Sequence, residues 1–324
     1  MEFRTLGRTG LSVSLVSFGT GGPSGFGAPE AAERPQRAAL VHRCLEHGIN
    51  LFDTSENYGE SEALLGEALA GVPRDRYLLL TKWAPSPRWS PAGMGGADAP
   101  IQTDPESLTR GLEASLRRLR TDAIDVMELH GVRPEQYEEV AERFIPVLDR
   151  LRAEGKIRYR GISERYIVDP AHEAVSLALE RHPDSWDVIS LKYGILNQFA
   201  ARRALPLARR HGTGVVCMSA VRSKLSQPAQ LRALIAELKR DELIADDALD
   251  DDDPLGWLIG GSVDSVITAG YRFAARHPDI HTVLTGTTNL RHLDANVACM
   301  ESLELPEEHA DRLRSVFGEL AVWA

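Results

Sequence analysis

Cysteine is scarce in this 324-residue chain, which contains only Cys44, Cys217 and Cys299. The three are isolated and odd in number, so neither a disulfide framework nor the ligand spacing of a zinc site is visible, and no metal centre is expected. No apolar run approaches the roughly 20 residues of a membrane span, and the residues after Met1 do not resemble a secretory signal. The sequence therefore predicts a cytoplasmic protein in a reducing compartment, without a membrane partner.

Positive charge is also in short supply. The chain has 37 Lys and Arg residues against 47 Asp and Glu residues, a net charge of −10. Proteins that bind nucleic acid or anionic membranes concentrate positive charge to displace counterions, so a nucleic-acid partner is not expected. The contents of 43% hydrophobic and 26% charged residues are ordinary for a globular protein. They suit a soluble enzyme that acts on a small molecule, and a homo-oligomer remains possible.

Apolar runs alternate with amphipathic stretches along most of the chain. The predicted strands are residues 13–18, 49–52, 77–82, 124–130, 159–163, 188–193, 214–219 and 282–286. The predicted helices lie near 36–47, 60–70, 105–119, 136–153, 170–181, 200–211, 262–277 and 290–300, the third and fifth opened by Asp-Pro pairs. Strict alternation implies a parallel sheet, and eight units are enough to close a barrel.

The two ends of the chain add elements to this barrel. Residues 1–15 alternate apolar and polar around Gly7 and Gly10, which predicts a β-hairpin cap, and residues 306–324 predict a final helix. We therefore expect an α/β fold, a (β/α)8 TIM barrel that occupies residues 1–324 as one domain.

Two segments are longer than the loops that such units need. Residues 83–103 follow the third strand on its carboxyl side and are expected to form a substrate loop, with a surface excursion as the alternative. Residues 221–261 are expected to form an insertion near a cofactor, containing a helix at 229–240. The acidic tract at 241–253 lacks the glycine and the terminal glutamate of a calcium loop, so a solvated loop is predicted.

Polar residues gather at the carboxyl ends of the second, third and fourth strands: Asp53, Tyr58, Lys82 and His130. In a barrel these ends share one mouth. A lysine beside a tyrosine favours the phenolate, so Tyr58 could exchange a proton near neutral pH while Asp53 keeps Lys82 charged. A neutral His130 could orient a carbonyl oxygen. Each residue alone has a structural interpretation, as a cap, a packing residue, a surface lysine or a core histidine; together they favour a catalytic site.

The glycine-rich stretch at residues 18–25 invites comparison with a dinucleotide-binding fingerprint. It does not fit, because Ser24 occupies the third glycine position and Pro23 and Pro29 interrupt the helix that should follow. A Rossmann site is therefore not predicted.

Over nearly its whole length the chain resembles the aldo-keto reductase family. The matching stretches are Leu6-Gly7-Arg8-Thr9-Gly10, Phe52-Asp53-Thr54 with Tyr58-Gly59, Thr81-Lys82, Ile124-Asp125 with His130, Gly155-Lys156-Ile157-Arg158, Gly161-Ile162-Ser163, and the segment from Gly286 to Asn296. Members of this family are (β/α)8 barrels that use NAD(P)H to interconvert carbonyls and alcohols. The resemblance implies that Asp53, Tyr58, Lys82 and His130 are the catalytic tetrad.

The resemblance also implies where the nicotinamide lies. Gly19, Thr20 and Asp53 are expected at this end of the cofactor site. Ser163 matches a carboxamide partner, whereas Glu164 stands where asparagine is usual and Ser190 where glutamine is usual. Glu164 either points away or accepts from the carboxamide nitrogen. Tyr193 is expected to stack on the nicotinamide ring.

The remaining cofactor contacts follow from the same resemblance. The pyrophosphate loop corresponds to Ser219, Ala220, Val221, Arg222, Ser223 and Lys224, although the two basic residues could simply face solvent. The adenosine end corresponds to Gly286, Thr288, His292 and Asn296, with Arg291 available for a 2′-phosphate. NADP is the expected cofactor, and NAD remains possible.

These features predict an oxidoreductase that transfers a hydride between the nicotinamide and the carbonyl or alcohol carbon of a small polar substrate, with Tyr58 as general acid and base. Trp83, Trp89 and His130 are assigned to the substrate site; further residues that could line an aromatic-walled pocket, or simply pack, are Pro85, Pro87, Met94, Met127 and Trp257. One alternative is a sugar or polyol dehydrogenase, or an enzyme that oxidises its substrate transiently with bound NAD(P). Another is a nucleotide-sensing module that resembles potassium-channel β subunits.

Overall fold

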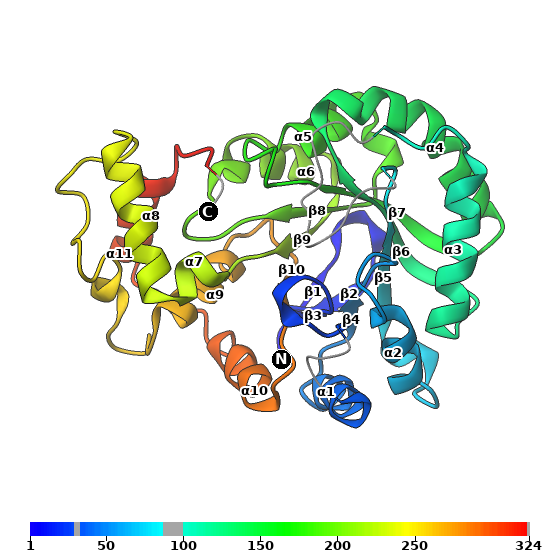
Figure 1. Cartoon of the computed structure of the whole chain (residues 1–324), viewed down its shortest axis with the longest axis horizontal. Coiled ribbons are helices and arrows are strands. Elements are labelled where there is room, and N and C mark those ends of the chain that lie inside the picture. The colour runs from blue at the N-terminus through cyan, green and yellow to red at the C-terminus, as the bar shows by residue number, and fades with distance from the viewer. Residues whose placement is uncertain (29–32, 87–99, 323–324) are drawn as a thin grey trace.

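Eight parallel strands form a closed barrel in the computed structural model, which describes residues 1–28, 33–86 and 100–322 (Figure 1). The barrel strands are β3 (Val16–Gly19), β4 (Leu51–Asp53), β5 (Leu78–Trp83), β6 (Ile124–Val132), β7 (Ile157–Glu164), β8 (Val188–Lys192), β9 (Gly214–Met218) and β10 (Thr282–Thr285). Neighbours in sequence are neighbours in the sheet, and β10 closes it against β3. The predicted (β/α)8 fold is confirmed.

The predicted hairpin is also confirmed, as β1 (Phe3–Thr5) paired antiparallel with β2 (Ser12–Ser14). Its Leu6, Leu11 and Val13 side chains pack in one cluster with residues that β4, β5, β6, β8 and β9 turn into the barrel. The hairpin therefore closes the amino-terminal end of the barrel. Gly7 has φ 49°, and a Cβ there would lie 2.3 Å from the Gly214 amide nitrogen, so this close approach requires glycine.

One strand prediction is wrong in its extent. Residues 13–18 form no continuous strand: β2 ends at Ser14, and β3 begins at Val16 in a different sheet. Apolar residues recur from Val13 to Phe18 without a turn signal, yet Val13 packs in the cluster of the hairpin whereas Val16 and Phe18 belong to the main core. Hydrophobicity alone cannot show this change of sheet.

Helices cover the outside of the barrel, and each predicted helix has a counterpart. Those that follow the barrel strands are α1 (Arg34–Glu46), α2 (Ser61–Ala68), α3 (Glu106–Leu119), α4 (Tyr137–Ala153), α5 (Glu173–Arg181), α6 (Ala204–His211), α9 (Val266–Ala275) and α10 (Leu290–Cys299). The fifth begins three residues later than the predicted Pro170, yet the Asp169 carboxylate still accepts hydrogen bonds from the Glu173 and Ala174 amides.

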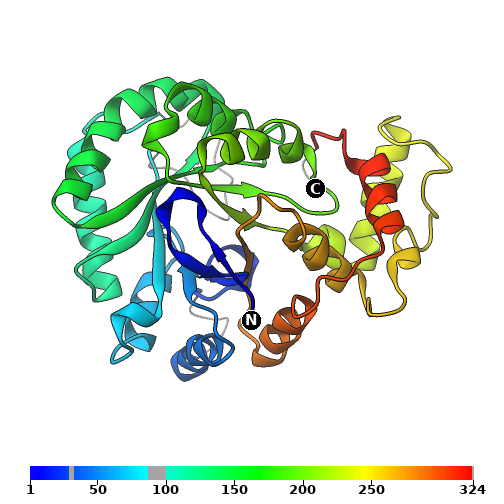
Figure 2. The ribbon, with the colours of Figure 1, turned by 180° about the vertical axis from the view of Figure 1, so that it is seen from behind.

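The insertion and the C-terminal segment contribute further helices. They are α7 (Ser223–Ser226), α8 (Pro228–Arg240) and α11 (Glu307–Phe317), and α8 and α11 lie together on the side of the molecule opposite α3 and α4 (Figures 1 and 2). The C-terminal segment is tied to the loop after β8, because Asn197 and Gln198 donate to the Val322 and Leu313 carbonyls. Among the described residues, no helix is long and apolar enough to cross a membrane.

Candidate active site at the barrel mouth

The four residues of the predicted tetrad meet at the carboxyl end of the barrel. Asp53 ends β4, Lys82 lies near the end of β5, His130 lies in β6, and Tyr58 follows β4 in the loop before α2. The Lys82 ammonium donates to the Asp53 carboxylate and, at 3.0 Å, to the Thr54 carbonyl. It lies 5.3 Å from the centre of the Tyr58 ring. The Tyr58 hydroxyl is 3.4 Å from His130 Nε2. The phenol of Tyr58 thus lies beside the imidazole of His130 and the buried ammonium of Lys82.

Backbone and side-chain contacts hold the phenol and the imidazole in place. A Cβ on Gly21 would lie 2.3 Å from the Tyr58 ring, so only glycine lets the chain pass so close to it. Ser55, which is fully buried, places its hydroxyl 3.1 Å from His130 Nδ1. The sequence analysis missed Ser55, although its position two residues after Asp53 on the same loop was a usable signal.

Burial decides the protonation of Tyr58. Burial raises the pKa of Tyr58 to about 12; Lys82 lowers this pKa, but Asp53 and Glu128 raise it again. The attraction of Lys82 does not bring the pKa of Tyr58 to neutral pH in the protein alone, because desolvation of the phenolate outweighs it. At neutral pH Tyr58 is a protonated phenol, which is the state of a proton donor.

The other charges in the tetrad follow the expected directions. Burial acts to lower the pKa of Lys82, but Asp53 and then Tyr58 raise it by more, so the amine stays charged. Burial, Lys82 and Arg165 together hold the pKa of His130 well below its usual range, so the imidazole is neutral. A neutral imidazole can donate to a carbonyl oxygen from one nitrogen.

Two arginines close to His130 were not singled out from the sequence. Arg133 and Arg165 follow β6 and β7, one residue beyond the paired Val132 and Glu164, and they are 9% and 8% exposed. Burial lowers the pKa of Arg165, and the charge of Arg133 lowers it further. Arg133 also pairs with Glu135 at 3.1 Å, so the structure places one paired guanidinium group and one further guanidinium group near His130.

Trp83 does not belong to the mouth, which corrects its assignment to the substrate site. It is 3% exposed and packs on Phe144 of α4 with ring centroids 4.8 Å apart. A Cβ on Gly111 of α3 would lie 2.4 Å from its ring. Successive side chains of a strand point to opposite faces, so the neighbour of the inward-facing Lys82 has to point outward. Trp89, Pro87 and Met94 lie outside the described residues.

The predicted nicotinamide partners are mostly engaged within the protein. Ser163 accepts from the Gly131 amide at 3.1 Å. The Glu164 carboxylate contacts His172 Nδ1 at 2.7 Å and accepts from the Lys192 amide at 2.9 Å, so of the two alternatives Glu164 points away. Ser190 donates to Glu128 at 2.6 Å inside the barrel.

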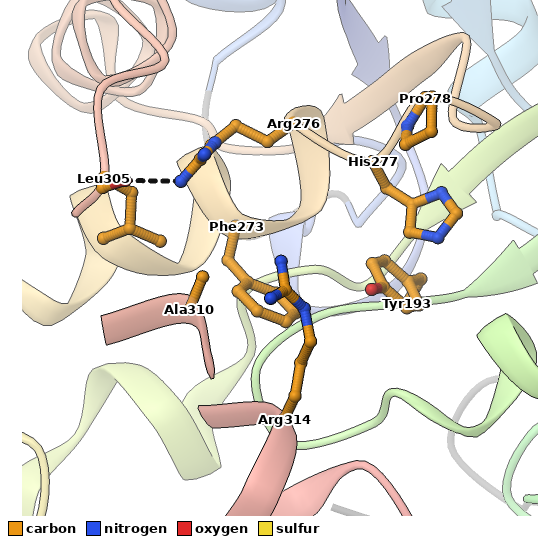
Figure 3. Close-up of a pocket in the computed structure, with 8 residues that line it drawn as sticks. All are labelled: Tyr193, Phe273, Arg276, His277, Pro278, Leu305, Ala310 and Arg314. Carbon is orange, nitrogen blue, oxygen red and sulfur yellow. Dashed lines mark hydrogen bonds between the residues drawn. The ribbon is translucent and has the colours of Figure 1, made fainter. Parts of the chain in front are cut away.

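Tyr193 lies outside the mouth, so its assignment as the stacking aromatic is corrected. Its ring stacks on Phe273 of α9 at 5.8 Å and meets the edge of His277 at 5.0 Å. With Arg276 and Arg314 these rings line a cavity of about 230 Å³ between the loop after β8, the end of α9 and α11 (Figure 3). Tyr193 therefore packs against the end of α9 and borders this cavity.

A cluster of cations occupies the other side of the mouth, at the ends of β8 and β9. Arg222 donates to the Tyr166 hydroxyl at 2.8 Å and to Ser219 Oγ at 3.2 Å, and the Lys192 ammonium lies 4.9 Å from the centre of the Tyr166 ring. Lys192, Arg222 and Lys224 line one small cavity together with Ser219. Arg222 does not simply face solvent. Three cations and a hydroxyl suit the oxygens of a pyrophosphate, so the donor set fits a dinucleotide.

Lys192 is the member of this cluster that the sequence analysis missed. It is 4% exposed, and burial, Arg222 and Lys224 lower its pKa to about 7. Its place at the end of a predicted strand was the available signal. The other residues of the predicted loop are less involved: Val221 packs toward Gly270, and Ser223 is exposed at the start of α7.

The predicted adenosine end lies where β10 leads into α10. Gly286 packs against the backbone of Gly19, and Asn296 donates to Thr285 Oγ1 at 2.6 Å. His292 and Arg291 are exposed on the first turn of α10. Thr20 hydrogen-bonds the Asp53 carbonyl through both its amide and its hydroxyl, which ties the end of β3 to the tetrad.

Comparison with known proteins agrees with this geometry. Residues 16–317 match the model of the Aldo/keto reductase family. The chain is 27% identical to L-galactose dehydrogenase of Arabidopsis thaliana, over 94% of this chain and 89% of that protein. It is 28% identical to NADH-specific methylglyoxal reductase of Escherichia coli, over 96% of this chain and 97% of that protein. Among solved structures, the holo form of an aldo-keto reductase from Bacillus halodurans aligns with a TM-score of 0.74 and 26% sequence identity. The alignment covers 100% of this chain and 98% of that chain.

A (β/α)8 barrel with this mouth, matched by the family model over nearly the whole chain, identifies the protein as a member of the aldo/keto reductase family and as an NAD(P)H-dependent oxidoreductase.

Proposed function

We propose that the protein reduces the carbonyl group of a small polar aldehyde, ketone or sugar with NADPH, and that Tyr58 is the proton donor. The observation that carries this proposal is the protonated Tyr58 hydroxyl, 3.4 Å from His130 Nε2 and next to the Asp53–Lys82 pair. The nicotinamide, when bound, supplies a hydride to the carbonyl carbon. The carbonyl oxygen takes the proton of Tyr58, which leaves an alcohol and a phenolate that solvent reprotonates.

Each tetrad residue has a distinct task in this proposal. Neutral His130 donates to the carbonyl oxygen and places it beside the Tyr58 hydroxyl. The Lys82 ammonium stabilises the negative charge that develops on the phenol oxygen as the proton leaves. Asp53 keeps Lys82 charged and pointed at the ring. Arg133 and Arg165 favour substrates that carry oxygen atoms or negative charge.

The cofactor would lie across the mouth from the tetrad to α10. Lys192, Arg222 and Lys224 would hold its pyrophosphate. Gly19, Thr20 and Ser163 would approach the nicotinamide end, and Thr288, His292 and Asn296 the adenosine end. NADPH is proposed over NADH because the exposed Arg291 at the start of α10 can pair with a 2′-phosphate. NADH is the alternative, and the relative from E. coli is named for its NADH specificity.

Oxidation of a sugar is the second candidate, because a relative of similar length and 27% identity is named L-galactose dehydrogenase. The same residues would act in reverse, with the Tyr58 phenolate as base. A module that only senses the nucleotide would not need four converging catalytic groups, so their arrangement argues against that alternative.

Hydride transfer can be tested directly with NADPH and NADH deuterated at nicotinamide C4. The purified protein would be assayed against a panel of aldehydes, ketones and sugars, and against the matching alcohols with the oxidised cofactors. We expect turnover of at least one oxygen-rich carbonyl compound, with deuterium at the new alcohol carbon and a lower KM for NADPH. Tight cofactor binding without turnover of any compound would contradict the proposal and favour nucleotide sensing.

A further inference from the structure

A second acid, Glu128, lies inside the barrel beneath the tetrad. It is in β6, two residues before His130, and it is fully buried. In the sheet its Cα pairs with that of Lys82 on β5 and with that of Gly161 on β7. Glu128 and the tetrad lysine therefore lie at the same level of the barrel on adjacent strands. No step proposed above uses this carboxyl group.

The barrel contains a specific place for the Glu128 side chain. A Cβ on Gly161 would lie 2.6 Å from Glu128 Cγ and 3.3 Å from its Oε1, so any larger residue on β7 would displace it. Across this gap, Oε1 accepts a hydrogen bond from Ser190 on β8 at 2.6 Å. Gly161 on β7 therefore leaves room for the Glu128 carboxyl group to pass over this strand, and Ser190 on β8 provides its hydrogen-bond donor.

The second carboxyl oxygen, Oε2, is buried and has no hydrogen-bond partner among the described residues. The titratable groups from neighbouring elements whose charges act on Glu128 are Lys82 of β5 and Asp53 of β4, and Glu128 in turn acts on Tyr58. Burial raises the pKa of Glu128 to about 7, although Lys82 and the hydrogen bond from Ser190 both lower it. Above this pH, two carboxylates surround one ammonium.

We propose that Glu128 is a positioning residue whose negative charge, on the strand next to Lys82, opposes the ionisation of Tyr58. The inference rests on the proposed role of Tyr58 as proton donor. The physical argument is Coulombic. The Glu128 carboxylate repels the negative charge of the phenolate and so offsets part of its stabilisation by Lys82, and the low polarity of the interior strengthens both interactions.

The test follows the ζ-carbon NMR signals of labelled tyrosines through a pH titration, with the Tyr58 signal identified by its loss in Tyr58→Phe. In Glu128→Gln the amide still accepts from Ser190, but the charge is gone. We expect the titration of Tyr58 to move to lower pH by about one unit. The high-pH decline of the reduction rate should move by the same amount. If Glu128→Gln does not fold, Glu128→Leu combined with Ser190→Ala removes the same charge without leaving the buried Ser190 hydroxyl unpaired.

Ser190→Ala is the matched control, because it removes the tether and keeps the charge of Glu128. Its Tyr58 signal should titrate as in the unmodified protein. An unmoved Tyr58 signal in folded Glu128→Gln or in the folded double variant would overturn the inference, and so would an equal shift in Ser190→Ala. The NMR readout needs no turnover. A shifted Tyr58 without carbonyl reduction would therefore refute the proposed function and leave this inference standing.

Discussion

The two sides of the barrel mouth differ in how their polar groups are paired. On the β4–β6 side, Lys82 pairs with Asp53, and His130 lies within hydrogen-bond distance of Ser55 and Tyr58. On the β8–β9 side, Lys192, Arg222 and Lys224 face one another around a cavity, and their like charges lower the pKa of Lys192. The first side pairs opposite charges, whereas the second brings like charges together, an arrangement that a bound anion would stabilise.

The same difference explains why one side matches the family pattern and the other departs from it. Proton transfer requires fixed geometry between a few groups, so the tetrad tolerates little change. A phosphate can be held by any cations and hydroxyls at suitable distances, so in the proposed function Arg222 and Lys192 would take the place of other donors. Variants on the two sides should therefore differ in whether they change turnover or cofactor affinity.

Loss of the Tyr58 hydroxyl should have the largest effect. Tyr58→Phe removes the only group in the proposal that delivers a proton, so kcat/KM for carbonyl reduction should fall by roughly a thousandfold. Cofactor affinity, measured by fluorescence titration, should be retained because the cation cluster is untouched. Tyr193→Phe is the matched control, since this tyrosine lies among α9 and α11 and not in the mouth. Normal turnover in Tyr58→Phe would refute the mechanism.

Trp83 should affect stability and not substrate affinity. Trp83→Ala leaves a cavity against Phe144 and α3, and the free energy of unfolding should fall by about 3 to 5 kcal/mol. Urea unfolding of this variant and of Trp83→Phe, which keeps most of the packing, gives the comparison. The KM for substrate of Trp83→Phe should stay unchanged. A raised KM at unchanged stability would instead return Trp83 to the substrate pocket.

Removing a cation from the β8–β9 side should weaken cofactor binding and leave the chemistry intact. Arg222→Met takes away one charge and its hydrogen bonds to Tyr166 and Ser219, so the Kd for NADPH should rise about tenfold while kcat changes little. Arg240→Met, on the exposed end of α8, is the control. A large loss of kcat with unchanged Kd would place Arg222 on the catalytic side.

Much of the fold and half of the site were accessible from the sequence, for a physical reason. Strand and helix periodicities are local signals, and eight strand–helix units leave few alternatives to a barrel. A barrel then brings the carboxyl ends of its strands together, so Asp53, Lys82 and His130 could be grouped although they are far apart in sequence.

The errors concern side-chain direction and partners across the barrel. Trp83 could have been excluded from the mouth by alternation with Lys82. The direction of the Glu164 side chain could not be predicted in this way, because its partner His172 reaches it only through a turn in which His172 has φ 59°. Glu128 was equally hidden: a buried acid makes sense only once Gly161 and Ser190 are known to face it on the next two strands.

The smallest predicted effect is a pH dependence of cofactor affinity carried by Lys192. Because its pKa lies near 7, Lys192 loses its charge as the pH rises from about 6 to about 8, and a bound pyrophosphate favours the charged form. Affinity should therefore fall as the pH rises, by a few-fold across this interval. NADH is the suitable ligand, because it lacks the 2′-phosphate, which titrates in the same range.

In Lys192→Met the affinity for NADH should be weaker at low pH and nearly independent of pH. Lys156→Met, which changes a lysine paired with Glu113 and Glu154 just before β7, is the control and should keep the slope of the unmodified protein. If Lys192→Met kept the slope as well, another group would be responsible for it. His130 is held neutral and Tyr58 protonated across this pH range, so neither contributes to the slope. Glu128 of β6 does titrate in this range, and Glu128→Gln should therefore keep the slope if Lys192 carries it.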